Sequence, residues 1–502
     1  MASTFCSGCL TQLRQTPRAI LPPPSTAVTR TAAFHTTAPF QKAIQKPKPS
    51  SHEGPKYRVG ATVKIKKKGR PQEKSRPPPP GERKALRKRI VLSNPNALEV
   101  EGMQELNGET MVDSRLRGSV LALPVPMIDQ LRAVQAFKTS QGWSIFRRPG
   151  TVLRRETLEM GRLFDQISNE SAGERTSLKR IITGQRKAGK SVHLLQATAM
   201  AFTKDWVVVS IPNARDLVIG HTSYAPLSEE QPNLYVQNAA TAELLSRTAT
   251  ANKKVLSKLL VSQKHAALPT VKPGMTLEDL AKLGIQDQAN AWPVFQALWA
   301  ELTATSATPG FEKHFTPRPP TLVTVDAVGH WMQNTAYRNI KHEIIHAHDF
   351  VLARHFLGLL KPGKEKPALP NGGALLYATS SSNSPSIYAL DIALKQAAAR
   401  YASVNPSSSD FPLPEAYSKP DTRVLEALNS PKPTAAKEGM LNVQELGGLT
   451  KDEARGFLEY FARSGLLRET VSDEWASEKW TLAGGGVVGE LEKLGRRLRV
   501  AA

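Results

Sequence analysis

A glycine-bounded loop between an apolar strand and an apolar helix constrains this chain more than any other feature. Residues 181–195 read IITGQRKAGKSVHLL, and GQRKAGKS within them matches the pattern GxxxxGK[ST]. Glycines let the backbone turn successive N–H groups inward, and the following helix offers the positive end of its dipole to an anion. The segment therefore predicts a phosphate-binding loop at the start of a βαβ unit.

This loop supplies a set of candidate nucleotide ligands. Lys190 is expected to reach the β- and γ-phosphates of a nucleotide, and the Ser191 hydroxyl to ligate Mg²⁺. The chain has no NKxD motif that would read guanine, so the pattern by itself does not determine the base. The predicted nucleotide-binding residues are Gly184, Gln185, Arg186, Lys187, Ala188, Gly189, Lys190, Ser191 and Val192.

Further apolar runs around the loop predict an α/β fold. LKRIIT, TLVTVD and GGALLYATSS read as short strands, and DWVVVSIP is almost continuously apolar, as is typical of a parallel strand buried on both faces. Residues 213–312, between the second and third runs, are mostly helical in pattern. We expect an AAA-like P-loop NTPase core with a parallel sheet over residues 151–400, interrupted by this helical insertion.

Two polar residues at strand ends are candidates for the same site. Asp326 ends the third run and is expected to hold Mg²⁺ together with Ser191. The next residue is Ala327, where motors of the AAA+ type place a glutamate that activates water, so efficient hydrolysis is not expected and no catalytic residue is assigned. Ser380 follows the fourth run, where a residue that senses the γ-phosphate would lie.

The segment HEIIH, residues 342–346, has the HExxH spacing of zinc proteases, with Glu343 as the base. The extended form of that motif requires Gly at position 349 and His at position 352, but this chain has Asp349 and Leu352. We therefore expect no zinc site. We interpret the segment as a helix beside the nucleotide domain, with Ile344, Ile345, Val351 and Leu352 facing inward.

The C-terminal part is expected to form a separate small module. Residues 401–437 are rich in Ser and Pro and read as a linker. In residues 438–502, NVQELGGLTKDEARGFLEYFARSGLL reads as two helices around a glycine turn, and WASEKWTLAGG reads as a hairpin. This order predicts a winged-helix-like module, whose acidic residues favour a docking or lid role over DNA binding.

Positive charge is concentrated at the N-terminus. Residues 1–91 contain 20 Lys/Arg and three Glu, and so carry +17 of the net charge of +23. Residues 1–45 are rich in Arg, Ser and Thr and contain no acid, a composition typical of a mitochondrial transit peptide. Residues 46–91 read as a disordered basic arm that contacts a polyanion, the alternative being a solvated tail with no fixed partner.

Other parts of the sequence exclude some classes of site. Cys6 and Cys9 are the only cysteines, so no further thiol could complete a zinc site with them. No run approaches the ~18 apolar residues of a membrane span, so no membrane insertion is expected.

Residues 92–150 mix turn signals with apolar pairs and are expected to pack on the core as an N-terminal extension.

Taken together, these segments resemble the mitochondrial small-subunit ribosomal protein family that includes death-associated protein 3. The matching residues are FRRPG at 146–150, GQRKAGKS, DWVVVSIPNARDLV at 205–218, TLVTVDAV and GGALLYATS. The resemblance implies a mitochondrial matrix protein of the small-subunit head, with neighbouring ribosomal proteins and small-subunit ribosomal RNA as partners. It also implies a bound guanine nucleotide (GTP or GDP, with ATP left open) and Mg²⁺, held by residues 184–191 and Asp326.

A second function stays open at this point. A matrix P-loop ATPase or GTPase that remodels nucleic acid or protein would carry the same loop. Co-sedimentation with the small mitochondrial ribosomal subunit after a high-salt wash would separate the two.

Overall fold

The structure is a computed structural model that describes residues 90–171, 175–272, 274–361, 367–381, 386–429 and 440–497. The predicted transit peptide and all but the last two residues of the predicted basic arm lie outside these ranges. The chain divides into residues 1–77 and 78–502, and every described residue belongs to the second unit.

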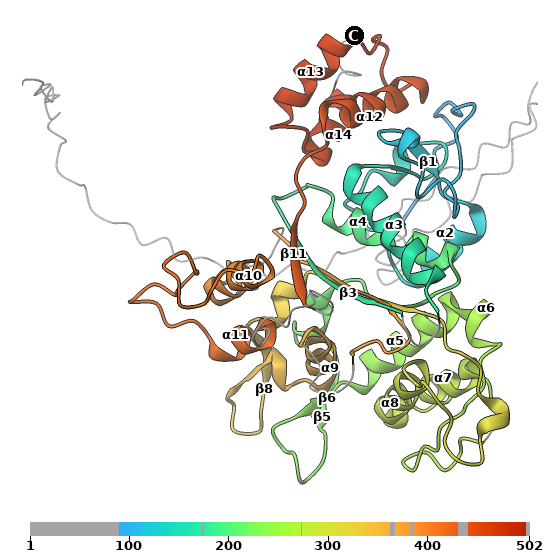
Figure 1. Ribbon diagram of the computed structural model, residues 1–502, viewed down its shortest axis with the longest axis vertical. Helices are drawn as coiled ribbons and strands as arrows, with labels where there is room; N and C mark the ends of the chain where they lie inside the picture. The colour runs from blue at the N-terminus through green and yellow to red at the C-terminus, as the bar shows by residue number, and fades with distance from the viewer. Residues whose placement is uncertain are drawn as a thin grey trace, which may run out of the picture. The chain divides into compact units, whose positions relative to one another are not determined.

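A five-stranded parallel sheet forms the centre of this unit (Figure 1). Its strand order is β11-β3-β10-β7-β4, so the strand before the phosphate loop, β3, is separated from the Asp326 strand, β7, by β10. All four predicted strands are confirmed, and the α/β fold class with them. The strands are β3 (Ser177–Thr183), β4 (Val207–Ile211), β7 (Thr321–Asp326), β10 (Gly373–Ala378) and β11 (Leu441–Glu445).

Helices cover both faces of the sheet, which explains why its strands are apolar at successive positions. Ile181, Val209 and Tyr377 point into one hydrophobic cluster, together with residues of α5, α8, α9 and α10. Their neighbours Ile182 and Val208 point into a second cluster with α2, α3 and α4. The helices are α2 (Val125–Ala133), α3 (Arg155–Asn169), α4 (Lys190–Thr203), α5 (Asn238–Ala251), α6 (Lys253–Leu256), α7 (Leu277–Gln286), α8 (Ala291–Leu302), α9 (Val351–Leu360), α10 (Tyr388–Tyr401), α11 (Thr422–Leu428), α12 (Lys451–Arg463), α13 (Asp473–Leu482) and α14 (Val488–Arg497).

The helical insertion predicted at residues 213–312 contains α5 to α8. Glu301, in α8, forms an ion pair at 2.7 Å with Arg318, which follows the insertion, and both side chains are fully buried. Glu301 also accepts hydrogen bonds from the backbone N–H groups of Ser262 and Gln263. These donors satisfy the buried carboxylate, which would otherwise destabilise the fold.

The HEIIH segment is not a helix, and this prediction was wrong. Residues 334–346 form a hairpin of β8 (Asn334–Arg338) and β9 (Ile344–His346), with His342 in the left-handed region at φ 62°. In β8 exposed and buried residues alternate, which is the pattern of a half-buried strand rather than of a helix. Ile345, Val351 and Leu352 are buried as expected, but Ile344 is 51% exposed.

The C-terminal module also differs from the prediction. Residues 441–445 are not helical but form β11, the edge strand beside β3 in the main sheet. WASEKWTLAGG, residues 475–485, does not form the expected hairpin. Residues 473–482 form the helix α13, because the Ser472 side chain caps its N-terminus and Asp473 and Glu474 fill its first turn. Within residues 440–497 the structure has three helices and no two-stranded wing, so the winged-helix-like order was wrong.

The segment predicted as a linker contains an ordered element. Residues 422–428 form α11, and its residues Val424 and Leu428 are buried in the same cluster as α10. Ser and Pro dominate the surrounding residues, which conceals this short apolar face in the sequence.

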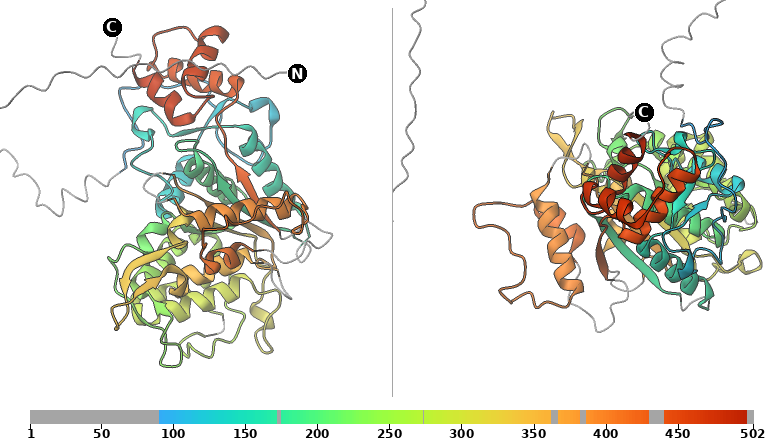
Figure 2. Two further views of the ribbon diagram at one scale, coloured as in Figure 1. Left: turned by 90° about the vertical axis from the view of Figure 1, so that its left-hand side faces the viewer. Right: turned by 90° about the horizontal axis from the view of Figure 1, so that it is seen from above.

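The N-terminal extension packs against the C-terminal helices. It contains α2 and the antiparallel pair β1 (Val120–Ala122) and β2 (Gly150–Val152), and its Ile145 and Phe146 join the core of α12, α13 and α14. Figure 2 shows these helices, in red, beside the blue and cyan extension and away from the yellow-green insertion. A further pair, β5 (Ala225–Pro226) and β6 (Tyr235–Val236), lies within the insertion.

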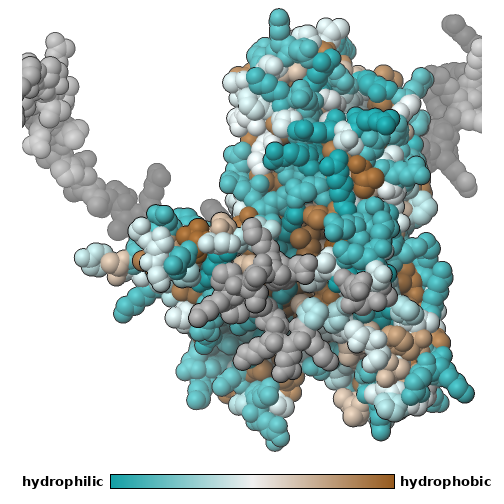
Figure 3. All heavy atoms as spheres, in the orientation of Figure 1, coloured by the Kyte–Doolittle hydropathy of each residue, from teal (hydrophilic) through white to brown (hydrophobic). Residues whose placement is uncertain are grey.

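The surface of the described unit is mainly hydrophilic on the face drawn in Figure 3. Small hydrophobic patches lie there between hydrophilic residues. Among the helices of the described ranges, none has the length and apolar character needed to cross a bilayer.

Candidate nucleotide site at the phosphate loop

The predicted phosphate loop lies between β3 and α4, as its sequence requires. Gly184, Lys187 and Gly189 all have positive φ, at 132°, 65° and 96°. A Cβ on Gly184 would lie 2.3 Å from the carbonyl oxygen of Leu446, so only glycine fits at that position. No side chain caps the N-terminus of α4 at Gly189, so its first N–H groups are available to an anion.

Lys190, the predicted phosphate ligand, is buried inside the loop. Its Nζ donates to the carbonyl oxygens of Gly184 at 2.6 Å and Gln185 at 2.9 Å, and lies 3.4 Å from Oγ of Ser381. Burial lowers the pKa of Lys190, while the charge of Asp326 acts to raise it. The loop therefore holds this ammonium beside the uncapped end of α4, the arrangement that a phosphate group requires.

Ser191 and Asp326, the predicted magnesium ligands, converge on one cation, the ammonium of Lys138 from the N-terminal extension. Lys138 Nζ forms an ion pair with Oδ2 of Asp326 and donates to Oγ of Ser191 at 3.4 Å. Oδ1 of Asp326 accepts a hydrogen bond from the Ala327 backbone at 2.8 Å. Both carboxylate oxygens are thus engaged by protein donors, an arrangement that does not fit Mg²⁺, which takes six close oxygen ligands.

The fourth strand brings serines to the loop. Ser380, the predicted phosphate sensor, is half-buried just beyond the end of β10. Its neighbour Ser381 contacts the loop: its Oγ donates to the Gly184 carbonyl at 3.3 Å and lies 3.4 Å from Lys190 Nζ. Sequence reasoning did not single out Ser381.

Arg154, which the sequence did not reveal, fastens the loop to the C-terminal region. Its side chain is 4% exposed and donates to the carbonyl oxygens of Ala188 at 3.2 Å and Gly447 at 3.0 Å. It also forms an ion pair with Glu156 at 2.8 Å. An arginine between two apolar segments carries no recognisable motif, because both carbonyl partners are distant in sequence.

Helix α14 covers the outer side of the loop. The Gly489 backbone N–H donates to the Lys187 carbonyl at 3.2 Å, and Lys187 Nζ pairs with Glu490 at 3.0 Å. Gln185, Arg186 and Lys187 are exposed, while Ala188 is buried. The charge of Lys187 is therefore directed to α14, whereas that of Lys190 is directed to the carbonyl groups of the loop itself.

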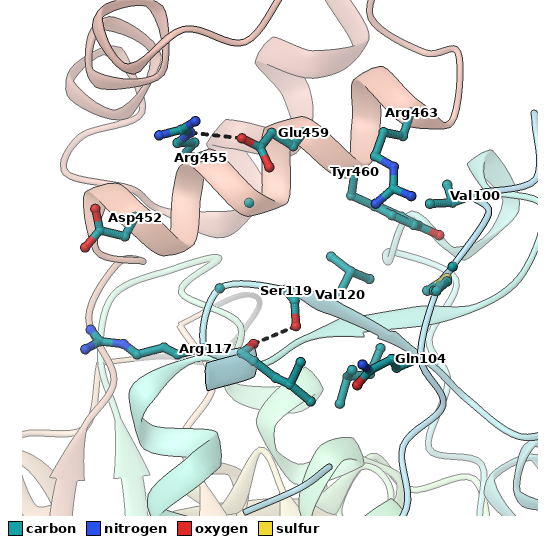
Figure 4. A pocket seen from close by; sticks show the side chains of 16 residues that line it. Val100, Gln104, Arg117, Ser119, Val120, Asp452, Arg455, Glu459, Tyr460 and Arg463 are labelled. Carbon is teal, nitrogen blue, oxygen red and sulfur yellow. Dashed lines mark hydrogen bonds and ion pairs between the residues drawn. The ribbon is translucent and has the colours of Figure 1, made fainter. Parts of the chain in front are cut away.

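Away from the phosphate loop, a cavity of about 470 Å³ lies between the N-terminal extension and α12 (Figure 4). Three arginines line it, but Arg455 is paired with Glu459 at 2.9 Å, Arg117 with Glu453 at 2.8 Å, and Arg463 donates to a backbone carbonyl. Each of these cations has a carboxylate or carbonyl partner in the chain. The phosphate loop is the better candidate for an anion site because it combines a buried lysine with a helix N-terminus that no side chain caps.

The parallel sheet, the glycine loop and the buried lysine define an α/β protein of the P-loop NTPase class. A family model described as mitochondrial ribosomal death-associated protein 3 matches residues 151–494. The chain is 37% identical over 505 residues to "Small ribosomal subunit protein mS29" of Neurospora crassa, covering 98% of each chain. The chain belongs to the mitochondrial ribosomal death-associated protein 3 family.

Family membership confirms the resemblance found in the sequence. It also confirms the expectation of a ribosomal protein of the mitochondrial matrix. Among solved structures, the Walker-type ATPase PABY2304 of Pyrococcus abyssi matches 68% of this chain and 69% of its own, at 14% identity and a TM-score of 0.31, which marks only a distant likeness.

Proposed function

We propose that this chain is a structural component of the small subunit of the mitochondrial ribosome and that its phosphate loop holds a guanine nucleotide as a resident ligand. The observation that carries the nucleotide proposal is the loop itself, with three residues at positive φ, an uncapped helix and a buried lysine. The guanine base is inferred from the family resemblance, since no described contact reads a base.

The surroundings of the loop favour a structural rather than a catalytic role. The loop is contacted by Lys138 of the N-terminal extension and by Arg154 at the start of α3. Leu446 and Glu490 of the C-terminal region contact it as well. A ligand bound there would therefore hold three distant parts of the chain together. Ala327, directly after Asp326, has only a methyl group and provides no base to activate water.

The test compares Lys190→Ala with Lys187→Ala, two alanine substitutions in the same loop. A ligand at a hundredfold excess over its Kd stabilises the folded state by about 2.7 kcal/mol, so GDP should raise the melting temperature of the wild type. Lys190→Ala should abolish this shift and reduce co-sedimentation with mitochondrial small subunits. Lys187→Ala should retain both, because that side chain is directed to α14.

An assay of nucleotide hydrolysis distinguishes this proposal from the alternative, a matrix NTPase. Neither GTP nor ATP should be hydrolysed above background by the wild type. Sustained turnover that Lys190→Ala abolishes, with unchanged melting and normal assembly into small subunits, would instead establish a working matrix NTPase. Parallel melts with GDP and ADP test the base.

A further inference from the structure

Lys138 occupies an unusual position for a residue outside the phosphate loop. It belongs to the N-terminal extension, yet its ammonium contacts Ser191, at the start of α4, and Asp326, at the end of β7. These are the two side chains that the loop motif assigns to a divalent cation. The Asp326 side chain is only 6% exposed and that of Lys138 28%, so this pair is largely shielded from water.

The backbone of Lys138 is held in place on both sides. The preceding residue, Phe137, is 4% exposed and packs edge-to-face on Trp143 at 5.1 Å. The Gln141 side-chain oxygen accepts from the Lys138 backbone N–H at 2.8 Å and from the Trp143 indole N–H at 2.6 Å. Lys138 is therefore presented to the site by a packed turn, unlike a lysine that moves freely at the surface.

A cavity that adjoins this pair, among the residues that the structure describes, is small. The adjoining cavity has a volume of about 20 Å³ and is lined by Lys138, Ser191, Ser210, Thr324 and Asp326, among others. That volume corresponds to about one water molecule. Mg²⁺ usually keeps several waters and requires near-octahedral geometry, and it would also meet the like charge of the ammonium.

We propose that the ammonium of Lys138 is the resident cation of this phosphate site, taking the position between Ser191 and Asp326 that Mg²⁺ has in hydrolytic P-loop proteins. The inference rests on the proposed nucleotide function. Its consequence is that the chain binds a guanine nucleotide without a divalent cation, using the charges of Lys138 and Lys190. A tethered ammonium neutralises phosphate but does not acidify a bound water as a metal does, which agrees with a ligand that is held and not hydrolysed.

The experiment measures the Kd of GDP for the full chain by titration calorimetry, once with Mg²⁺ and once with EDTA. The wild type should bind GDP equally well in both buffers. Lys138→Met removes the charge but keeps the length of the side chain, so GDP binding should weaken by about tenfold or more in EDTA and be partly restored by Mg²⁺. Lys254→Met is the matched control, since Lys254 also pairs with an aspartate, Asp205 at 2.7 Å, but on the surface.

The outcomes separate this inference from the function on which it rests. Wild-type binding that is lost in EDTA overturns the role of Lys138 and leaves the proposed nucleotide function intact. Absence of GDP binding in both buffers overturns the nucleotide function, and this inference with it. If Lys138→Met does not fold, the wild-type comparison still decides, and a folded Lys138→Met with wild-type affinity in EDTA also overturns the inference.

Discussion

Arg154 shows how one side chain can hold three segments of this fold together. Its guanidinium group has almost no exposure, and its donors reach Glu156, the phosphate loop at Ala188 and the turn at Gly447. Hydrogen bonds from a charged donor to buried carbonyl groups are stronger than neutral ones, and their loss leaves those carbonyls without partners. The planar guanidinium suits this role because it can donate in several directions.

Arg154→Ala should lower the free energy of unfolding by about 3 kcal/mol, the range expected when a buried charged group with several partners is removed. The neighbouring variant Arg155→Ala should change it by less than about 0.5 kcal/mol, because that side chain is 72% exposed. Urea denaturation of both variants measures the difference. Equal effects of the two substitutions would show that Arg154 does not hold the segments together.

At the scale of single elements, α9 carries a buried histidine among aromatic rings. His355 lies 5.2 Å from the ring of Phe295 and 4.9 Å from that of Trp299, both on α8. Burial lowers the pKa of His355 to about 4, since the imidazolium would lose its hydration between these rings. The α8–α9 contact therefore requires a neutral imidazole.

The stability of the chain should consequently fall in mild acid. The unfolded histidine takes up a proton below its ordinary pKa of 6.5, whereas the folded one does so only near 4, so stability is lost as the pH falls between these values. His355→Phe removes this linkage. Between about pH 7 and about pH 5, the wild type should lose about 2 kcal/mol more than the variant. Urea denaturation of both proteins at both pH values measures this difference. Equal losses of unfolding free energy in the wild type and the variant would show that His355 takes up its proton in the folded state as well.

At the scale of the whole described unit, the N-terminal extension, the core and the C-terminal helices meet at Glu453. This carboxylate is 1% exposed and accepts from Arg117 Nε, from the Arg155 backbone N–H and from the Thr450 backbone N–H. Burial acts to raise the pKa of Glu453, but hydrogen bonds from Thr450, Arg117 and Arg155 outweigh it and lower the pKa below its usual value. The extension and the C-terminal helices are thus joined through one buried charge.

The basic arm is expected to add affinity for ribosomal RNA in a salt-dependent way. Replacing Lys64, Lys66, Lys67 and Lys68 by Gln removes four cations, and each cation that no longer neutralises a phosphate reduces the slope of log K against log salt by about 0.7 to 0.9. The slope for small-subunit ribosomal RNA should fall by about 3 if all four lysines bind phosphate. A variant with residues 77–80 changed from Pro to Ser keeps the charge and should keep the slope. An unchanged slope in the lysine variant would identify the arm as a solvated tail.

The sequence by itself determined the features that depend on neighbouring residues. The phosphate loop could be predicted because its glycines, at Gly184 and Gly189, meet a local steric requirement for positive φ. Four of the five strands of the sheet could be predicted because burial on both faces favours short apolar runs, of which β4 is the clearest. The helix α12 carries its own start signal, the capping box of Thr450 and Glu453.

Only the tertiary structure decided the contacts between distant segments. HEIIH matches a helical spacing, yet its last three residues form β9 because pairing with β8 buries Ile345, a gain that no local pattern records. Residues 441–445 become a strand because the edge of β3 offers unpaired backbone groups to them. Lys138 meets Asp326 across 188 residues, since the packing of Phe137 and Trp143 sets the direction of its side chain. Local sterics fix the loop, whereas packing between remote segments fixes which charges surround it.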